Sequence, residues 1–108
     1  MKLIRIVKMT FQEDKVDAFL DIFESSKDKI AAMPGCNSVE LLQGFNEENV
    51  FSTYSIWDSE EDLNNYRKSE LFGGVWKATK ALFADKPIAF SLKKCHSEFI
   101  EESKANIY

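Results

Sequence analysis

Hydrophobic positions along the chain follow two spacings, one typical of strands and one typical of helices. Four short runs rich in β-branched and aromatic residues predict strands, and two longer stretches with apolar residues three and four positions apart predict helices. The predicted strands span residues 3–11, 36–45, 50–57 and 88–95, and the predicted helices span residues 13–33 and 59–83. The order of elements is therefore β-α-β-β-α-β.

The first predicted strand is apolar on both faces. Leu3, Val7 and Met9 share one parity, whereas Ile4 and Ile6 share the other. A strand at the surface of a protein usually alternates apolar and polar residues, so we expect this strand to be covered on both sides. The third predicted strand also carries aromatic and hydroxyl side chains on both faces.

The first predicted helix ends at a clear break in the pattern. Pro34 cannot continue a helix, and Gly35 is free to adopt a positive φ. The strand that follows is expected to place Val39, Leu41 and Phe45 on one face. The apolar stripe of the helix before the break is formed by Val16, Phe19, Leu20, Phe23, Ser26, Ile30 and Met33.

Two serines mark helix starts within the second predicted helix. Ser59 precedes three acidic residues, and Ser69 precedes Glu70, the pattern expected of an N-cap and a first turn. The stretch is therefore either one bent helix or two short helices in tandem. Each glycine of the Gly73-Gly74 pair costs a helix roughly 1 kcal/mol relative to alanine. We expect the pair to allow a close approach to the sheet or a ligand, or to mark a kink.

This order of elements predicts an α+β fold, a ferredoxin-like βαββαβ antiparallel sheet with two helices on one face. Right-handed crossovers place both helices on the same side, with the second and fourth strands at the edges. The opposite face of the sheet is then bare, although the first and third strands are apolar on that side as well. We therefore expect a homodimer through the sheet faces.

Composition limits the classes of function that the chain can have. A length of 108 residues fits one domain, which we place at residues 1–95, followed by a polar C-terminal tail at residues 96–108. The formal net charge of −4, with scattered basic residues, argues against nucleic acid and membrane partners. No membrane span or signal pattern is apparent, so we expect a cytoplasmic protein.

The cysteines and the histidine do not predict a metal site. Cys36 and Cys95 lack metal-ligand spacing, and we expect two reduced thiols at the ends of opposite edge strands rather than an internal disulfide. His96 is the single histidine of the chain, and we expect it to be exposed in the tail. A transition-metal site needs more ligands than these residues supply.

The stretch 57–72 carries a family resemblance. Trp57-Asp58-Ser59, followed one helix later by Tyr66-Arg67-Lys68-Ser69-Glu70-Leu71-Phe72, resembles the antibiotic biosynthesis monooxygenase domains of the dimeric α+β barrel superfamily. The resemblance covers residues 2–95. It implies a dimeric α+β barrel and the oxygenation of electron-rich phenols or quinols without a cofactor.

The resemblance also suggests site residues. Tyr66 stands where the resembled enzymes often carry a tryptophan, and Asp62 stands where the quinone-forming members carry an asparagine. We expect Tyr66 and Asp62 to be catalytic and Val7, Asn65, Phe72 and Trp76 to contact a small aromatic substrate. A structural role stays open for each: Phe72 and Trp76 as core residues, and Asp62 as a first-turn acid.

The haem-degrading branch of the family fits this sequence poorly. Its members use an asparagine, a tryptophan and an axial histidine, and the aligned positions here are Val7, Tyr66 and Trp76. We therefore expect no haem degradation and no cofactor.

The sequence leads to a monooxygenase hypothesis with two alternatives. The favoured function is a cofactor-independent monooxygenase acting on an aromatic or quinol-type molecule in a pocket between helices and sheet. The alternatives are a non-enzymatic ligand-binding or stress-associated dimer, and an isomerase or decarboxylase of the same fold. Tyr66 facing inward beside Asp62 or Asn65 would favour chemistry. We expect Arg67 and Lys68 to point to solvent. Arg5 shares the parity of Val7 and could point into a pocket, but we favour a strand-end arginine turned to solvent.

Overall fold

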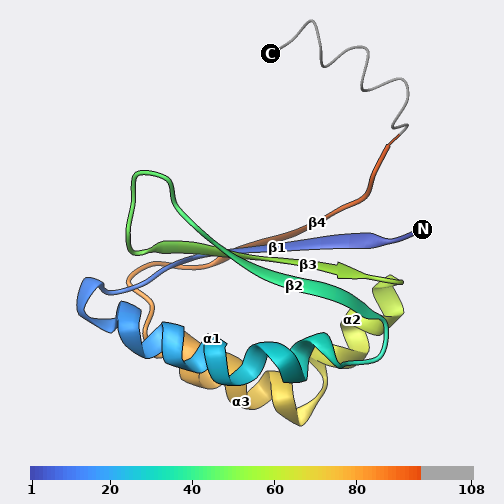
Figure 1. Cartoon of the computed structure of the whole chain (residues 1–108), viewed down its shortest axis with the longest axis horizontal. Helices are drawn as coiled ribbons and strands as arrows, with labels where there is room; N and C mark the ends of the chain where they lie inside the picture. The colour runs from blue at the N-terminus through green and yellow to red at the C-terminus, as the bar shows by residue number, and fades with distance from the viewer. Residues whose placement is uncertain (96–108) are drawn as a thin grey trace, which may run out of the picture.

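A computed structural model describes residues 1–95 as a four-stranded antiparallel sheet with its helices on one face (Figure 1). The strand order β2-β3-β1-β4 confirms the predicted ferredoxin-like α+β fold, with β2 and β4 at the edges. His96 and the predicted tail lie outside the described residues. The elements are β1 (Leu3–Thr10), the 3-10 turn η1 (Glu13–Lys15), α1 (Val16–Ala31), β2 (Cys36–Gln43), β3 (Val50–Trp57), α2 (Glu60–Arg67), α3 (Glu70–Lys80) and β4 (Ile88–Leu92).

The second helical region forms two helices in tandem. The hydroxyl of Ser59 accepts a hydrogen bond from the backbone N–H of Asp62 at 3.1 Å, and the hydroxyl of Ser69 accepts one from the N–H of Phe72 at 3.1 Å. Each serine thus caps its own helix, because it satisfies a backbone donor that the first turn leaves free.

None of the helices in residues 1–95 is both long enough and apolar enough to cross a membrane.

Strand ends differ from the predicted ones where a hydrogen-bonding partner is missing or a turn intervenes. β2 ends at Gln43, because the Gly44 N–H bonds to the carbonyl of Val50 at 2.7 Å and closes the hairpin. The prediction that Phe45 shares a face with Val39 was wrong, since Phe45 lies in the hairpin and is 100% exposed. β4 ends at Leu92, which pairs with Ile4 near the start of β1.

The core lies where β1 and β3 meet the helices. Phe11 and Trp57 are fully buried, and the ring of Phe11 stacks on that of Phe19 at 4.1 Å between centroids. Met9 and Phe51 complete this cluster. Leu20, which the pattern placed on the buried stripe of α1, is 37% exposed.

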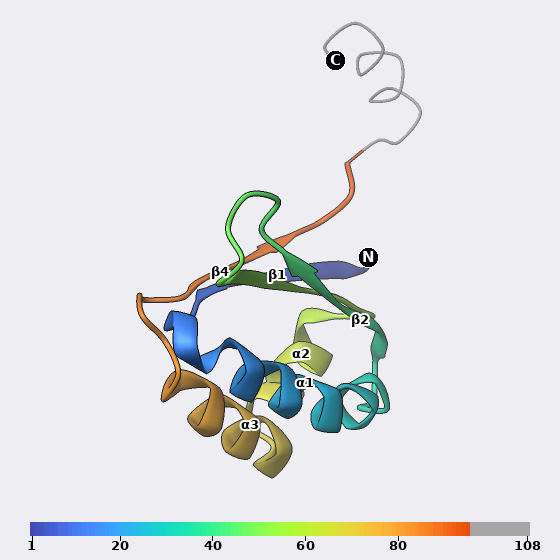
Figure 2. The same cartoon turned by 60° about the vertical axis from the view of Figure 1, so that its left-hand side comes forward.

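The face of the sheet away from the helices carries no helix from residues 1–95 (Figures 1 and 2). An apolar area covers much of it, and the polar residues Lys8, Glu40 and Ser52 lie on the same side. Side chains alternate between faces along a strand, so the even-numbered residues of β1 and β4 point to this side, opposite Val7 and Met9. Leu92, Phe90 and Ile88 on β4 are 50%, 43% and 56% exposed. The pairing register places Ile4 between Leu92 and Ile56 and places Ile6 between Phe90 and Tyr54. We call this surface, formed by Ile4, Ile6, Tyr54, Ile56, Ile88, Phe90 and Leu92, the open face.

Gly73 and Gly74 do not lie against any other element in the described part of the chain. A Cβ atom built at either position would meet no described atom within 4 Å, and α3 continues through the pair. Neither the expected close approach nor an interruption of the helix is seen, and nothing in the structure explains the pair.

Candidate functional site

A cavity of about 280 Å³ lies between the helices and the covered face of the sheet. α1, α2 and α3 form one wall, and the odd-numbered residues of β1 and β3 form the other, because those side chains point toward the helices. Its position fits the pocket expected from the sequence. The lining residues are Arg5, Val7, Met9, Phe19, Ile22, Phe23, Ser26, Ile30, Val39, Thr53, Ser55, Trp57, Leu63, Tyr66, Arg67, Phe72, Val75, Trp76, Thr79, Pro87 and Ala89.

A continuous row of aromatic rings forms one wall of the cavity. Trp57 stacks on Tyr66 with 5.1 Å between centroids, and Tyr66 meets Phe72 edge to face at 5.2 Å. Phe72 in turn stacks on Trp76 at 5.9 Å. The helical spacing across the Ser69 cap predicts that Tyr66, Phe72 and Trp76 turn toward the sheet, and their place in the lining confirms it. Val7 also lines the cavity.

Tyr66 places a neutral hydroxyl group in this aromatic wall. Burial, and secondarily the neighbouring Cys36 side chain, raises the pKa of Tyr66 to about 12. The phenol therefore keeps its proton across the physiological pH range and can donate a hydrogen bond. It is better suited to act as a donor than as a base.

Polar groups on β1 and β3 form a second region of the lining. Arg5 is paired in register with Ser55, and its Nη1 donates to the Oγ of Ser91 on β4 at 3.1 Å. The Oγ of Ser55 accepts a hydrogen bond from the indole Nε1 of Trp57 at 2.9 Å. Thr53 also lines the cavity and pairs in register with Val7 on β1. The cavity thus combines aromatic walls with a polar patch on the central strands.

The prediction that Arg5 points to solvent was wrong, because Arg5 is half-buried and lines the cavity. Arg67 is exposed, as predicted, although it also contributes to the lining. The signal for Arg5 was in the sequence, since it shares the parity of Val7 and Met9 on β1. Arg67 is the last residue of α2, and its long side chain reaches the cavity although the residue is exposed overall.

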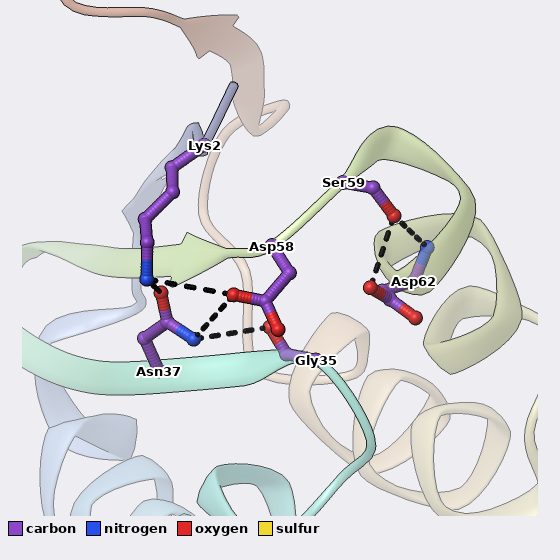
Figure 3. A network of polar contacts seen from close by, with 6 residues as sticks. All are labelled: Lys2, Gly35, Asn37, Asp58, Ser59 and Asp62. Atoms are coloured by element: carbon purple, nitrogen blue, oxygen red, sulfur yellow. Dashed lines mark hydrogen bonds and ion pairs between the residues drawn. The ribbon is translucent and has the colours of Figure 1, made fainter.

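Asp62 and Asn65 do not line the cavity. Figure 3 shows Asp62 held at the start of α2, where its Oδ2 accepts a hydrogen bond from the Ser59 hydroxyl at 2.9 Å. A Cβ atom at Gly35 would lie 2.2 Å from the Asp62 carboxyl carbon, and Gly35 also adopts a φ of 81°. Asp62 therefore packs against the turn before β2, which matches the alternative of a first-turn acid. Asn65 is exposed.

A surface network lies close to this turn but outside the cavity (Figure 3). Lys2 donates to the side chain of Asn37 and forms an ion pair with Asp58 at 3.4 Å. Asn37 Nδ2 donates to Asp58 at 3.0 Å, and mainly this hydrogen bond lowers the pKa of the Asp58 carboxyl. The network joins the starts of β1 and β2 to the end of β3.

Comparison with known proteins identifies a family that the sequence matches. The sequence model described as antibiotic biosynthesis monooxygenase matches residues 3–77. The chain belongs to this family. Among curated proteins, the sequence has no significant match.

Solved structures share the fold of this family member at low sequence identity. A conserved protein from Methanosarcina mazei Go1 superposes with a TM-score of 0.84 at 15% identity, covering 88% of this chain and 94% of that one. Rv0793 from Mycobacterium tuberculosis gives 0.82 at 14% identity, covering 90% and 98%. SnoaB from Streptomyces nogalater, a cofactor-independent oxygenase solved as a mutant, gives 0.78 at 14% identity, covering 89% and 95%.

Proposed function

We propose that this protein is a cofactor-independent monooxygenase that oxidises a small aromatic phenol, quinol or enol in the helix–sheet cavity. The observation that carries the proposal is the make-up of the cavity, in which Tyr66 belongs to an aromatic wall and Arg5, Thr53 and Ser55 supply polar groups. A mostly apolar cavity with a few polar groups is the usual form of a small-molecule site. Membership of the antibiotic biosynthesis monooxygenase family supports this chemistry, and SnoaB, which shares the fold, is a cofactor-independent oxygenase.

Anthrone illustrates the reaction, because its enol form is an electron-rich phenol. Loss of the enol proton gives an anion, and this anion donates electrons to dioxygen as a carbon–oxygen bond forms. Cleavage of the O–O bond then leaves one oxygen atom as the new carbonyl. The other oxygen departs as water with the two hydrogens of the oxidised carbon, so the substrate supplies every electron.

Tyr66 stabilises the anion in this scheme. Its neutral hydroxyl donates a hydrogen bond to the substrate oxygen, where negative charge develops. No aspartate or glutamate among residues 1–95 lines the cavity, so the enol proton leaves to solvent. Asp62 therefore has no part in this scheme, and Phe72 and Trp76 hold the substrate ring.

A homodimer through the open face completes the proposed enzyme. Contiguous apolar patches above a few hundred Å² are rare on monomeric proteins, and the open face spans three strands. A second copy placed face to face would bury Phe90 and Leu92, which are 43% and 50% exposed in the single chain. Two sheets packed in this way form an α+β barrel.

A non-enzymatic ligand-binding dimer is the second candidate function. It is favoured by the placement of Asp62 and Asn65 outside the cavity, which leaves Tyr66 without the expected polar neighbour. The same cavity and walls would serve to hold an aromatic molecule without converting it.

Substitution of Tyr66 by Phe separates these candidates. We expect Tyr66→Phe to slow anthrone oxidation by roughly 100-fold, because one positioned proton donor contributes about that factor. The matched control is Tyr54→Phe, which removes the same hydroxyl from the open face and should keep the parental rate. The measurement is anthraquinone formation above the uncatalysed rate in air-saturated buffer. Equal rates for Tyr66→Phe and the parent would contradict the role of Tyr66, and no acceleration by the parent would support the binding protein.

A further inference from the structure

Two guanidinium groups line the cavity, one from each layer of the fold. Arg5 lies on β1 in the sheet, and Arg67 is the last residue of α2 above it. Within residues 1–95, the ion pairs are Lys2–Asp58 and Lys27–Glu24, so neither arginine is paired with a carboxylate there. Two cations that line one cavity without an acidic partner give a mostly apolar site a positive region.

The neighbours of Arg5 leave most of its donors available. Only Nη1 has a protein partner within the described chain, the hydroxyl of Ser91 at 3.1 Å. A guanidinium carries five N–H donors in a planar fork that matches a carboxylate. Burial, and then the positive charge of Arg67, lowers the pKa of Arg5, so holding both charges here carries a cost. An anion between the two side chains would offset that cost.

We propose that Arg5 and Arg67 form an anion subsite, which makes the preferred ligand an aromatic carboxylate. This inference rests on the proposed function, because it specifies the substrate class for the same cavity. The carboxylate would lie between the two guanidinium groups, and the ring would lie along the wall of Tyr66, Phe72 and Trp76. Planar carboxylates suit arginine forks, and the cavity of about 280 Å³ limits the ring system to a small one.

The subsite also fixes how the ring enters the cavity. Arg5, Arg67 and Tyr66 all line the same cavity, so an acid group held by the arginines keeps the adjoining ring in the space that Tyr66 also lines. The anion therefore orients the substrate as well as binding it, which is how remote binding groups assist a reaction.

A matched pair of probes tests the subsite without turnover. 2-Naphthoate and 2-naphthamide have nearly the same shape, but only the naphthoate is charged. We expect isothermal titration calorimetry to show that the parent protein binds 2-naphthoate about tenfold more tightly or better, as a charge-assisted hydrogen-bond pair allows. Arg5→Gln and Arg67→Gln should each reduce that preference, and the double variant should abolish it while its affinity for 2-naphthamide stays unchanged.

Controls keep the test independent of folding and of catalysis. Lys68→Gln removes one positive charge next to Arg67 from a side chain that does not line the cavity, and it should keep the full preference. If Arg5→Gln does not fold, as judged by circular dichroism, Arg67→Gln alone decides the result. Equal affinity of the parent for the two probes, no binding of 2-naphthoate, or a preference that survives in the double variant would overturn the subsite. Loss of anthrone oxidation with intact naphthoate preference would instead contradict only the proposed function.

Discussion

Each face of the sheet carries some residues of the kind that is usual on the other face. The face that the helices cover carries Arg5, Thr53 and Ser55 around a cavity, whereas the open face carries Ile6 and Phe90 toward solvent. Normally the covered side of a sheet is apolar and the exposed side is polar. Both faces of this chain thus depart from the normal pattern in opposite directions.

In our proposal, each face is completed by something outside the chain. A few polar groups in a mostly apolar cavity are typical of a small-molecule site. Exposed apolar strands need a covering surface. We therefore interpret the covered face as the ligand site and the open face as the dimer interface.

Substituting two tryptophans that both line the cavity compares a fully buried ring with a half-buried one. Trp57 is fully buried, so Trp57→Ala should reduce the free energy of unfolding by about 3–5 kcal/mol. Trp76 is half-buried at the cavity, so Trp76→Ala should cost less, about 2 kcal/mol. Urea unfolding followed by circular dichroism measures both values. Equal losses for the two variants would show that Trp76 is an ordinary core residue.

Ile6→Asp tests the open face. Each copy of a face-to-face dimer would bury the new carboxylate among Tyr54 and Phe90, so we expect dimerisation to weaken by roughly 100-fold. Each chain should stay folded, because Ile6 points away from the helices. Sedimentation velocity over a range of protein concentrations measures the change.

The matched control for the open face is Ala78→Asp. It adds the same charge on the exposed side of α3 and should leave the sedimentation unchanged. A parent protein that sediments as a monomer at micromolar concentration would contradict the proposal that the open face is a dimer interface. An Ile6→Asp protein that remains dimeric would contradict it as well.

A smaller effect is expected from the titration of Tyr66. The folded state raises the pKa of Tyr66 from 10.0 to about 12, so the folded protein holds this proton more tightly than the unfolded chain. The stability that comes from the protonated Tyr66 is therefore fully present below pH 10, and it is lost as the pH rises toward about 12. Urea midpoints measured across this range should fall less in Tyr66→Phe than in Tyr54→Phe. Both variants keep Cys36, so titration of its thiol affects the two proteins equally. If the urea midpoints of the two variants fall in parallel with pH, the Tyr66 hydroxyl is not buried in solution.

Most of the fold could be predicted from the sequence, because the signals that set it are local. The β-branched runs, the Pro34-Gly35 break and the two serine caps indicated the strands, the helices and their order. Phe45 was misplaced because a hairpin closed by the Gly44 N–H interrupts the alternation. Such a turn depends on the pairing of two strands, which the period of one strand does not reveal.

The candidate site was only partly predictable, since it depends on how separate elements meet. The helical spacing correctly predicted that Tyr66, Phe72 and Trp76 face the sheet. Asp62 carried the right chemistry for a base, but the turn at Gly35 and the Ser59 hydroxyl hold it elsewhere. The opposite error concerned Arg5: its charge suggested solvent, whereas its parity on β1 placed it in the cavity. Parity therefore outweighs residue type on a strand that helices cover.

The most direct test of the proposed function is oxygenation of anthrone under ¹⁸O-labelled dioxygen by protein stripped of metals and flavins. We expect anthraquinone with one labelled oxygen, labelled water as the second product, and a rate that scales with protein concentration. We expect no release of hydrogen peroxide, because the two products contain both atoms of dioxygen. Formation of anthraquinone no faster than in buffer alone, or acceleration only after a metal or flavin is restored, would contradict the proposed function.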